Sequence, residues 1–295
     1  MRVFLTGSTG FIGAQVTREL LDAGHDVLGL TRSDEGERAL RSVGAVAHRG
    51  NIEDLDSLRN GAEQCDAVIH TAFDHDFAHF VENCHKDARV IDALGTALQG
   101  SARPLIITSS VAMGATTSGQ PSDEDHFDAT HPHPRTASER AGQALSERGI
   151  NVVVMRLSQI HNPVKQGLIT YLIELARQTG VSAYVGEGQE GWSAAHLTDT
   201  AQLYRLALEK HQPGARYNAV AEQGVAFRDI AQLIGEGLGV PTVTLTPEQA
   251  TGHFGWMAGF AGLDMSASST KTRERLGWTP TGPGLLEDLR VCLSR

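Results

Sequence analysis

Eight residues near the start of the chain, TGSTGFIG at 6–13, restrict the possible fold more than any other stretch. An apolar run precedes them and an amphipathic run follows, so they join a strand to a helix. Gly7 permits a tight turn, Gly10 lets a phosphate approach the backbone, and Gly13 lets the helix pack close to the sheet. Free N–H groups at the helix start favour an anion. The predicted contacts with a dinucleotide pyrophosphate are Gly7, Ser8, Thr9, Gly10, Phe11, Ile12 and Gly13.

The first half of the chain alternates short apolar runs with helical stretches. We predict strands at 2–7, 25–32, 45–52, 66–73, 104–110, 150–158 and 215–220. Helices are predicted at 10–24, 35–44, 54–65, 77–100 and 135–149. This alternation requires right-handed crossovers and predicts an α/β fold with a doubly wound, parallel, Rossmann-type sheet.

Residues 115–134 interrupt the alternation with a polar stretch rich in proline, histidine and acidic residues. It is too long for a simple connection and is predicted to be a functional loop. Its end, HPHP at 131–134, is expected to be stiff, with both histidines exposed.

The end of the second predicted strand distinguishes between the two nicotinamide cofactors. NAD-binding chains usually hold an acid there for the ribose 2′-hydroxyl, whereas this chain has Thr31, Arg32 and Ser33. An arginine with flanking hydroxyls suits a 2′-phosphate, which a carboxylate would repel. The sequence therefore favours NADP(H); the alternative is that Arg32 is an ordinary surface charge.

Composition excludes several classes of partner. A net charge of −10 argues against nucleic acid. Cys65, Cys84 and Cys292 are too few and too scattered for a disulfide framework or a zinc site. No apolar run reaches the length of a membrane span, and a strand at residue 2 leaves no room for a cleavable signal. We expect a cytoplasmic protein without nucleic-acid or membrane partners.

Four segments together resemble one superfamily. They are TGSTGFIG, GNIEDLDSL at 50–58, HLTDTA at 196–201 and RLGWTP at 275–280. The chain is similar in these segments to the extended short-chain dehydrogenases/reductases, which include nucleotide-sugar epimerases and dihydroflavonol-type reductases. The resemblance covers nearly the whole chain. It implies a seven-stranded Rossmann domain, a small C-terminal substrate domain and an active site in the cleft between them.

On this basis the dinucleotide-binding domain is expected at 1–164, with a return of the chain to it at about 194–222. The substrate-binding domain is expected at 165–193 and 223–295.

The resemblance also implies site residues. Ser109 matches the family's catalytic serine or threonine, and Asn83 an asparagine that orders the active-site water. The alternatives are a strand-end hydroxyl and a helix-surface amide. Further residues implied to line the cofactor are Asn51, Ile52, Thr71, Ala72, Phe73, Leu157, Ser158 and Gln159.

The family's catalytic tyrosine and lysine, four residues apart, are missing from the expected place. Aligned on Pro134, Arg135 stands for the tyrosine and Glu139 for the lysine; one residue further on, the pair is Thr136 and Arg140. In the family the tyrosine donates a proton, while the lysine lowers the tyrosine's pKa and holds the ribose. Arginine stays protonated at working pH, so Arg135 cannot be the general acid, although it can stabilise a developing alkoxide. In the other register Arg140 would hold the ribose and Thr136 a substrate oxygen.

Other groups are candidates for the proton donor. Tyr184, His161 and His196 are considered, and the resemblance assigns His196 a structural role. Water relayed through Ser109 is a further alternative, because the cofactor carries most of the chemistry.

The pocket residues favour a small or apolar substrate. Trp192 stands where nucleotide-sugar enzymes of the group commonly carry an arginine for the diphosphate, and it could cover an apolar substrate. Met113 and His161 are expected near that substrate. The aromatic segment HFGWMAGF at 253–260 is interpreted mainly as core of the small domain. His75 and His79 have metal-like spacing on a predicted helix but lack a third ligand in register, so no metal is expected.

Together these features predict an atypical member of the superfamily that uses NADPH to reduce a ketone or aldehyde. Two alternatives remain open. One is an NADP(H)-binding redox sensor without turnover, which the missing tyrosine and lysine favour; the other is an epimerase or dehydratase. The expected partner is a small-molecule carbonyl compound. The resemblance implies a monomer, or a homodimer formed through parts of 76–98 and 135–148.

Overall fold

A computed structural model describes residues 1–116 and 120–295. Its central sheet has seven strands in the order β10-β6-β5-β4-β1-β2-β3, and every neighbouring pair is parallel. The strands are β1 Arg2–Thr6, β2 Asp26–Thr31, β3 Val46–Arg49, β4 Ala67–His70, β5 Leu105–Ser110, β6 Val152–Leu157 and β10 Arg216–Ala219. This confirms the predicted parallel Rossmann-type sheet. The strand order reverses between β1 and β4, where ligands of such sheets bind beyond the carboxyl ends of the strands.

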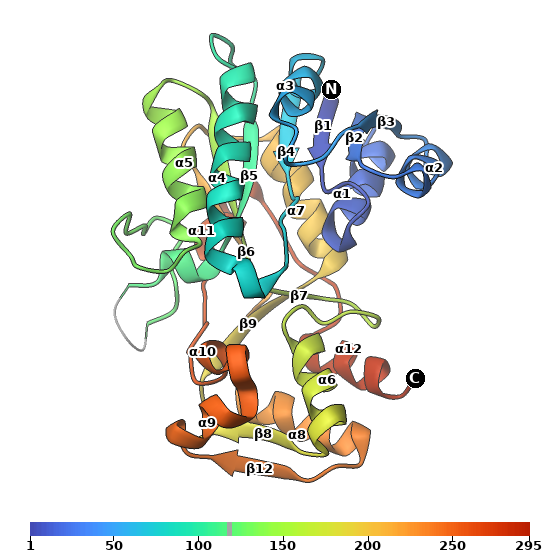
Figure 1. The fold of residues 1–295 in the computed structure, drawn as a ribbon. Coiled ribbons are helices and arrows are strands. Elements are labelled where there is room, and N and C mark those ends of the chain that lie inside the picture. The colour runs from blue at the N-terminus through green and yellow to red at the C-terminus, as the bar shows by residue number, and fades with distance from the viewer. Residues whose placement is uncertain (117–119) are drawn as a thin grey trace.

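Helices cover both faces of the sheet (Figure 1). One face carries α1 Phe11–Asp22, α2 Asp34–Ser42 and α7 Leu197–Glu209; the other carries α3 Leu55–Glu63, α4 Phe80–Ala97 and α5 Thr136–Glu147. The strands explain this arrangement, because alternate side chains point to opposite faces. In β1, Val3 and Leu5 pack in the first layer and Phe4 in the second, all without exposed surface.

A second lobe lies below the carboxyl ends of the parallel strands (Figure 1). It holds a three-stranded sheet of β11 Glu222–Ala226, β9 Gly191–His196 and β7 Gln159–His161, and a two-stranded sheet of β12 Thr242–Leu245 and β8 Ser182–Val185. Its helices are α6 Ile169–Thr179, α8 Phe227–Leu238, α9 Pro247–Phe254, η3 Gly255–Met257, α10 Ala258–Ala261 and α12 Leu285–Leu293. Apart from β7, whose Ile160 packs in the core of the first lobe, these elements share a separate apolar core.

One segment of the range 223–295 departs from the expected second domain. Helix α11, Thr270–Leu276, contacts β10. Leu276 and Trp278 are buried in the α1–α7 layer of the first lobe. The Trp278 indole N–H donates to the Asp199 carbonyl at 3.0 Å, which ties the segment to α7.

The long polar segment after β5 is partly ordered by the second lobe. It begins with the short helix η2, Val111–Gly114. Ser122 then exchanges backbone hydrogen bonds with Ser266 and Ser268, at 2.8 and 2.9 Å. Residues 117–119 of the predicted loop lie outside the described residues. In the ranges 1–116 and 120–295, no helix combines the length and apolarity needed to cross a membrane.

Candidate active site

The glycine turn has the geometry that a bound pyrophosphate requires. Gly7 has φ +69°, a conformation that L side chains rarely adopt, and a Cβ at Gly13 would collide with the Gly7 carbonyl. A Cβ at Gly10 would meet only the Gly7 oxygen, so its other side is open. Among the described residues, no side chain caps α1 at Gly10. The first-turn N–H groups of α1 are therefore available to an anion, and the turn fits a dinucleotide.

The end of β2 presents a free cation. Thr31 is buried, whereas Arg32 is exposed and makes no ion pair with any residue that the structure describes. Ser33 caps α2, since its hydroxyl accepts the Gly36 N–H at 3.1 Å. The neighbouring carboxylate of Asp34 is paired with Arg49 at 3.2 Å. This arrangement leaves the Arg32 guanidinium able to meet a phosphate.

Several residues expected to line the cofactor also have local structural partners. The Thr71 hydroxyl donates to the Thr6 carbonyl at 2.7 Å, and the Asn51 side chain accepts the Glu53 N–H at 2.7 Å. The Ser158 hydroxyl donates to Ala219 O at 2.6 Å, and Gln159 Oε1 accepts the Leu168 N–H at 3.1 Å. The remaining members of this set are Ile52, Ala72 and Leu157, which are partly buried, and Phe73, discussed below.

The carboxyl ends of β5, β6 and β10 stand level with one another. Ser110 pairs with Leu157, and Leu157 with Ala219. Just beyond this row lies a recess of about 220 Å³, lined by Val220, Ala221, Gln223, Ala267, Ser268, Ser269, Thr270 and Arg273. Ser109 is one residue back on β5 and is buried, yet its hydroxyl has no hydrogen-bond partner within the described chain. A buried hydroxyl is normally bonded, so this one keeps its capacity to bond a ligand. Other buried polar atoms of the described residues, among them His161 Nε2 and Trp192 Nε1, also lack a partner, so it is the position of Ser109 at the end of β5 that singles it out.

Arg135 occupies the start of α5 and belongs to a buried polar cluster, which we call the Arg135 cluster: Arg135, Asp87, His70 and Ser138. One guanidinium nitrogen of Arg135 donates to Asp87 Oδ2 at 2.8 Å and to the Ser138 hydroxyl at 2.9 Å. The other terminal nitrogen donates to the Thr108 carbonyl at 2.8 Å, next to Ser109. The guanidinium also lies 4.1 Å from the centre of the Phe73 ring.

Asp87 is held ionised by this cluster. His70 Nε2 lies 2.9 Å from Asp87 Oδ1, and the Ser138 hydroxyl donates to Oδ2 at 2.6 Å. Burial alone would raise the pKa of the Asp87 carboxyl. The charge of Arg135 and the hydrogen bonds outweigh this effect and lower the pKa to about 2.

Four residues further on, Glu139 forms a second buried group, the Glu139 cluster: Glu139, Arg156 and Arg216. Arg156 donates to both carboxylate oxygens at 2.8 and 2.9 Å, and Arg216 adds a contact of 3.0 Å. Neither Glu139 nor Arg156 has any exposed surface. In the other register, Thr136 is buried and donates to His131 O, whereas Arg140 is exposed on α5.

None of the chain's four tyrosines precedes a lysine by four residues. Tyr204, which sequence analysis missed, has its hydroxyl 2.6 Å from Thr108 Oγ1, close to Ser109. It is fully buried, and burial raises the pKa of its hydroxyl. Tyr204 therefore cannot reach a substrate as a proton donor.

Three expectations about the site are corrected by the structure. Trp192 has no exposed surface and packs 4.8 Å from the Phe227 ring in the core of the second lobe, so it does not cover a substrate. His161 is fully buried and pairs with Asp288 at 2.7 Å. Tyr184 lies in β8, at the end of the second lobe remote from β5 (Figure 1). None of the three is placed to act on a bound substrate.

Other side chains also differ from expectation. Asn83 is buried, and its amide donates to the Asp76 carbonyl at 2.9 Å. His131 is exposed, but His133 is half-buried against Phe80. His75 precedes the short helix η1, Phe77–His79, instead of lying within a helix. In the described ranges no group of three potential ligands could hold a metal ion.

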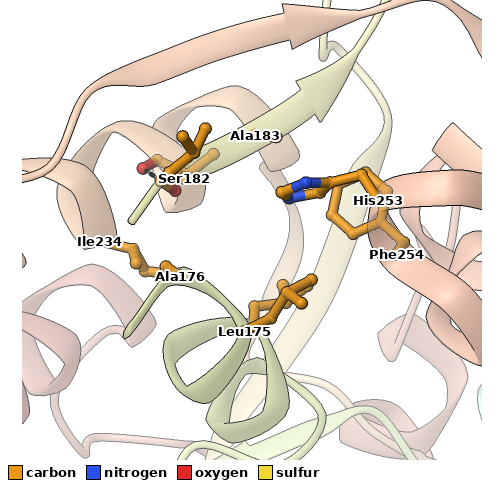
Figure 2. A pocket seen from close by; sticks show the side chains of 10 residues that line it. Leu175, Ala176, Ser182, Ala183, Ile234, His253 and Phe254 are labelled. Atoms are coloured by element: carbon orange, nitrogen blue, oxygen red, sulfur yellow. Dashed lines mark hydrogen bonds between the residues drawn. The ribbon is translucent and has the colours of Figure 1, made fainter. Parts of the chain in front are cut away.

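The hollow in Figure 2 is not a ligand site. It lies between α6, β8, α8 and α9 and is lined by apolar side chains with Ser182 and His253 at its edge. Its free space is about 10 Å³, hardly enough for one water molecule. The features suited to chemistry are instead at the carboxyl ends of the parallel strands.

Comparison with known proteins identifies the family. The profile of the NAD dependent epimerase/dehydratase family matches residues 3–220. The chain belongs to this family. Uncharacterized protein C2A9.02 of Schizosaccharomyces pombe is 43% identical over 98% of each chain. A 2-alkyl-3-oxoalkanoate reductase of Stenotrophomonas maltophilia is 27% identical, covering 82% of this chain and 77% of the reductase.

Solved structures of the family share the fold. The crystal structure of gox2253 has a TM-score of 0.77 and 21% identity, covering 99% of this chain and 96% of the other. DesIV, a dTDP-glucose 4,6-dehydratase from Streptomyces venezuelae with NAD bound, has a TM-score of 0.77 and 18% identity, with the same coverage.

Membership implies an NAD(P)-dependent enzyme of the oxidoreductase or epimerase type, which binds a nicotinamide dinucleotide.

The site residues that sequence analysis missed are His70, Asp87, Ser138 and Tyr204. His70 carried a signal, since a histidine ends an otherwise apolar run. Asp87 and Ser138 gave none, because they lie at ordinary positions of predicted helices, and Tyr204 lies on α7, outside the predicted helix ranges.

Proposed function

We propose that this protein uses NADPH to reduce a ketone or aldehyde group of a small, apolar substrate. The observation that carries the proposal is the Ser109 hydroxyl, which is buried and unpartnered within the described chain at the end of β5. Its neighbour Thr108 accepts a hydrogen bond from the Arg135 guanidinium. A free donor beside a fixed positive charge suits a carbonyl oxygen that becomes negative during reduction.

The cofactor would be held at two places. The first turn of α1 and Gly10 would take the pyrophosphate. Arg32 and Ser33 would take a 2′-phosphate, since Arg32 is exposed and has no ion-pair partner in the described ranges. The negative charge of Asp34 would repel a 2′-phosphate, but the ion pair with Arg49 compensates this charge.

The cofactor supplies a hydride when it is bound. Ser109 donates a hydrogen bond to the carbonyl oxygen and orients it. The positive charge of Arg135 stabilises the developing alkoxide, although Asp87 weakens this effect. Water supplies the proton, because Tyr184, His161 and Tyr204 are not placed to do so. The Ser109 hydroxyl relays it, giving its own proton to the substrate oxygen and taking one from the water.

Two kinds of relative support ketone reduction. The similar Stenotrophomonas protein is named for reducing a 3-oxoalkanoate. A ketoreductase of Stigmatella aurantiaca is 25% identical over 86% of this chain and 80% of the ketoreductase. The first of these names fits a substrate with an apolar chain.

The test is oxidation of NADPH and NADH, followed by absorbance, against aliphatic ketones, aromatic ketones, aldehydes and diketones. We expect turnover with NADPH on at least one class. Arg32→Ala should reduce the preference for NADPH over NADH about tenfold or more, because a charged contact to the 2′-phosphate is lost.

Arg38→Ala, which removes an exposed arginine of the helix that follows Arg32, α2, is the matched control and should leave the preference unchanged. NADPH binding without turnover of any compound would overturn the proposal in favour of a redox sensor. Tightly bound nicotinamide that co-purifies and is not consumed would favour an epimerase or dehydratase.

A further inference from the structure

Aromatic rings from both lobes meet beyond the carboxyl ends of the strands. We call Phe77, Tyr171 and Trp256 the aromatic bridge. Phe77, in η1 of the first lobe, stacks on Trp256 of η3 in the second, with ring centres 4.5 Å apart and planes 13° apart. Tyr171 of α6 meets both edge-on, at 5.8 Å from Phe77 and 5.3 Å from Trp256. Figure 1 shows the start of α4 directed toward the lobe that carries α6 and α10.

The bridge is not part of a folding core. Trp256 is 46% exposed and Tyr171 41% exposed. The first and last residues of the FGWM segment, Phe254 and Met257, are buried, so they anchor η3 and leave Trp256 facing outward. Exposed aromatic rings gathered in one place are typical of a binding surface.

The backbone of the turn that carries Phe77 is held in position by α4 through hydrogen bonds, none of which involves the Phe77 ring. The Asp76 side chain accepts the Ala78 N–H at 3.0 Å and so caps η1. The buried Asn83 amide donates to the Asp76 carbonyl at 2.9 Å. Lys86 fixes the same loop through Asp74 at 2.8 Å. These contacts present the Phe77 ring to the second lobe.

The bridge is continuous with the proposed catalytic residues. Phe77 stacks on Phe80 at 5.8 Å, and Phe80 meets the Phe73 ring at 6.1 Å. Arg135 lies over Phe73 at 4.1 Å and binds the Thr108 carbonyl, adjacent to Ser109. A substrate whose carbonyl lies at Ser109 would therefore extend along aromatic surface.

The three side chains of the bridge are aromatic and carry no formal charge. His75 lies 6.1 Å from Phe77, and the surrounding protein lowers the pKa of its imidazole, with the positive charges of Lys165 and Arg135 adding to the effect. An uncharged, flat group is therefore the best match in chemistry and shape.

We infer that the aromatic bridge binds a planar, uncharged ring of the substrate, so that the preferred substrates are aromatic or conjugated ketones and aldehydes. The inference rests on the proposed function and names its substrate class. At 4.5 Å, the Phe77 and Trp256 rings leave no room for a third ring between them. The substrate ring takes the place of Phe77 against the indole when it binds.

The first test is intrinsic fluorescence with 2-acetonaphthone as the probe and NADP⁺ as the cofactor, so that no reduction takes place. The chain has three tryptophans; Trp192 and Trp278 are buried, and only Trp256 is exposed. We expect saturable quenching that Trp256→Phe abolishes. Quenching that persists unchanged in Trp256→Phe would overturn the inference.

Calorimetry of the same binding separates ring recognition from general apolarity. Trp256→Ala should weaken 2-acetonaphthone about tenfold, and Trp256→Phe by no more than about threefold. Binding of 2-decanone should change little in either variant. Leu263→Ala is the matched control, since Leu263 is 45% exposed in the same region. Equal losses for the aromatic and the aliphatic ketone would overturn the inference.

Calorimetry also keeps the two proposals distinguishable. If 2-acetonaphthone binds in a way that depends on Trp256 but is not reduced when NADPH is supplied, the ring-binding role of the aromatic bridge is supported and the proposed reductase activity is contradicted. If aliphatic ketones are reduced independently of Trp256, the proposed reductase activity is supported and the ring-binding role of the aromatic bridge is contradicted.

Discussion

Arg135 and Glu139 lie four residues apart at the start of α5, and each belongs to a buried cluster of charged side chains. The two clusters differ in how their charges are balanced. In the Arg135 cluster one carboxylate, Asp87, balances one arginine, and the arginine also holds the end of β5 through the Thr108 carbonyl. In the Glu139 cluster two arginines share one carboxylate. Arg156 turns its remaining N–H groups to the carbonyls of Asp123 and His126.

The difference indicates which cluster borders the proposed site. The Arg135 cluster reaches the strand end where Ser109 has a free hydroxyl. The Glu139 cluster joins α5 to β6, β10 and the loop after η2, and all its close contacts are satisfied within the protein. We therefore expect the Glu139 cluster to matter for stability and the Arg135 cluster for both stability and turnover.

The largest effect is expected from Glu139→Gln. The change leaves Arg156 without its charge partner in a fully buried position. The free energy of unfolding should fall by about 3–5 kcal/mol, measured by urea denaturation. Turnover per folded molecule should remain, because the cluster does not reach the strand end.

Glu147→Gln is the matched control on the same helix, since Glu147 is exposed, and it should change stability by no more than about 0.5 kcal/mol. A loss below about 1 kcal/mol for Glu139→Gln would contradict a structural role for the buried pair.

A smaller loss of stability with a clear loss of turnover is expected from Arg135→Met. Asp87 loses its buried charge partner but keeps its contacts with His70 and Ser138, so the free energy of unfolding should fall by about 3 kcal/mol, the lower end of the range for a broken buried pair. The turnover number should fall about tenfold or more, since a fixed charge near the carbonyl is removed.

Ser109→Ala completes the comparison. It removes a hydroxyl without a partner among the described residues, so stability should stay within about 0.5 kcal/mol. Turnover should nevertheless fall about a hundredfold. If both Arg135→Met and Ser109→Ala retained full turnover, the proposed roles at the strand end would be wrong.

The last prediction is a dependence of stability on pH. The pKa of Asp87 is lowered to about 2 in the folded state, below the ordinary value of 3.8. Its ionised form therefore stabilises the fold above about pH 4, and this contribution, about 2 kcal/mol, is lost as the pH falls from about 4 to 2. Urea denaturation between neutral pH and pH 2 measures it.

Asp87→Asn should lack this part of the acid dependence, and its difference from the wild-type protein should shrink as the pH falls. Asp22→Asn, at an exposed position, serves as the control and should follow the wild-type curve. Parallel curves for Asp87→Asn and the wild type would show that Asp87 is not the group responsible.

Local patterns in the sequence predicted most of the first lobe. The strands from β1 to β6 and the glycine turn follow from short apolar runs and from glycines at required positions, which act over a few residues. Ser109 was implied by the resemblance to the family and did not follow from a local pattern. The helix assignments near the site were less successful, because His75 lies in a loop and η1 is a short separate turn.

The environment of the aromatic residues could not be predicted in this way. Trp192 was expected at the substrate and is buried beside Phe227, whereas Trp256 was expected mainly in the core and is exposed. Both are tryptophans among apolar neighbours, so composition does not separate them. Their exposure depends on which residues of distant segments pack around them.

The sequence by itself determined the parallel sheet, the pyrophosphate turn, and the absence of a tyrosine–lysine pair, because each is a property of neighbouring residues. The tertiary structure decided the surroundings of the residues that stand at the expected place. Arg135 and Glu139 acquire their roles from Asp87 on α4, Arg156 on β6 and Arg216 on β10, which are distant along the chain. A buried charge depends on its partner, and only the folded chain selects that partner.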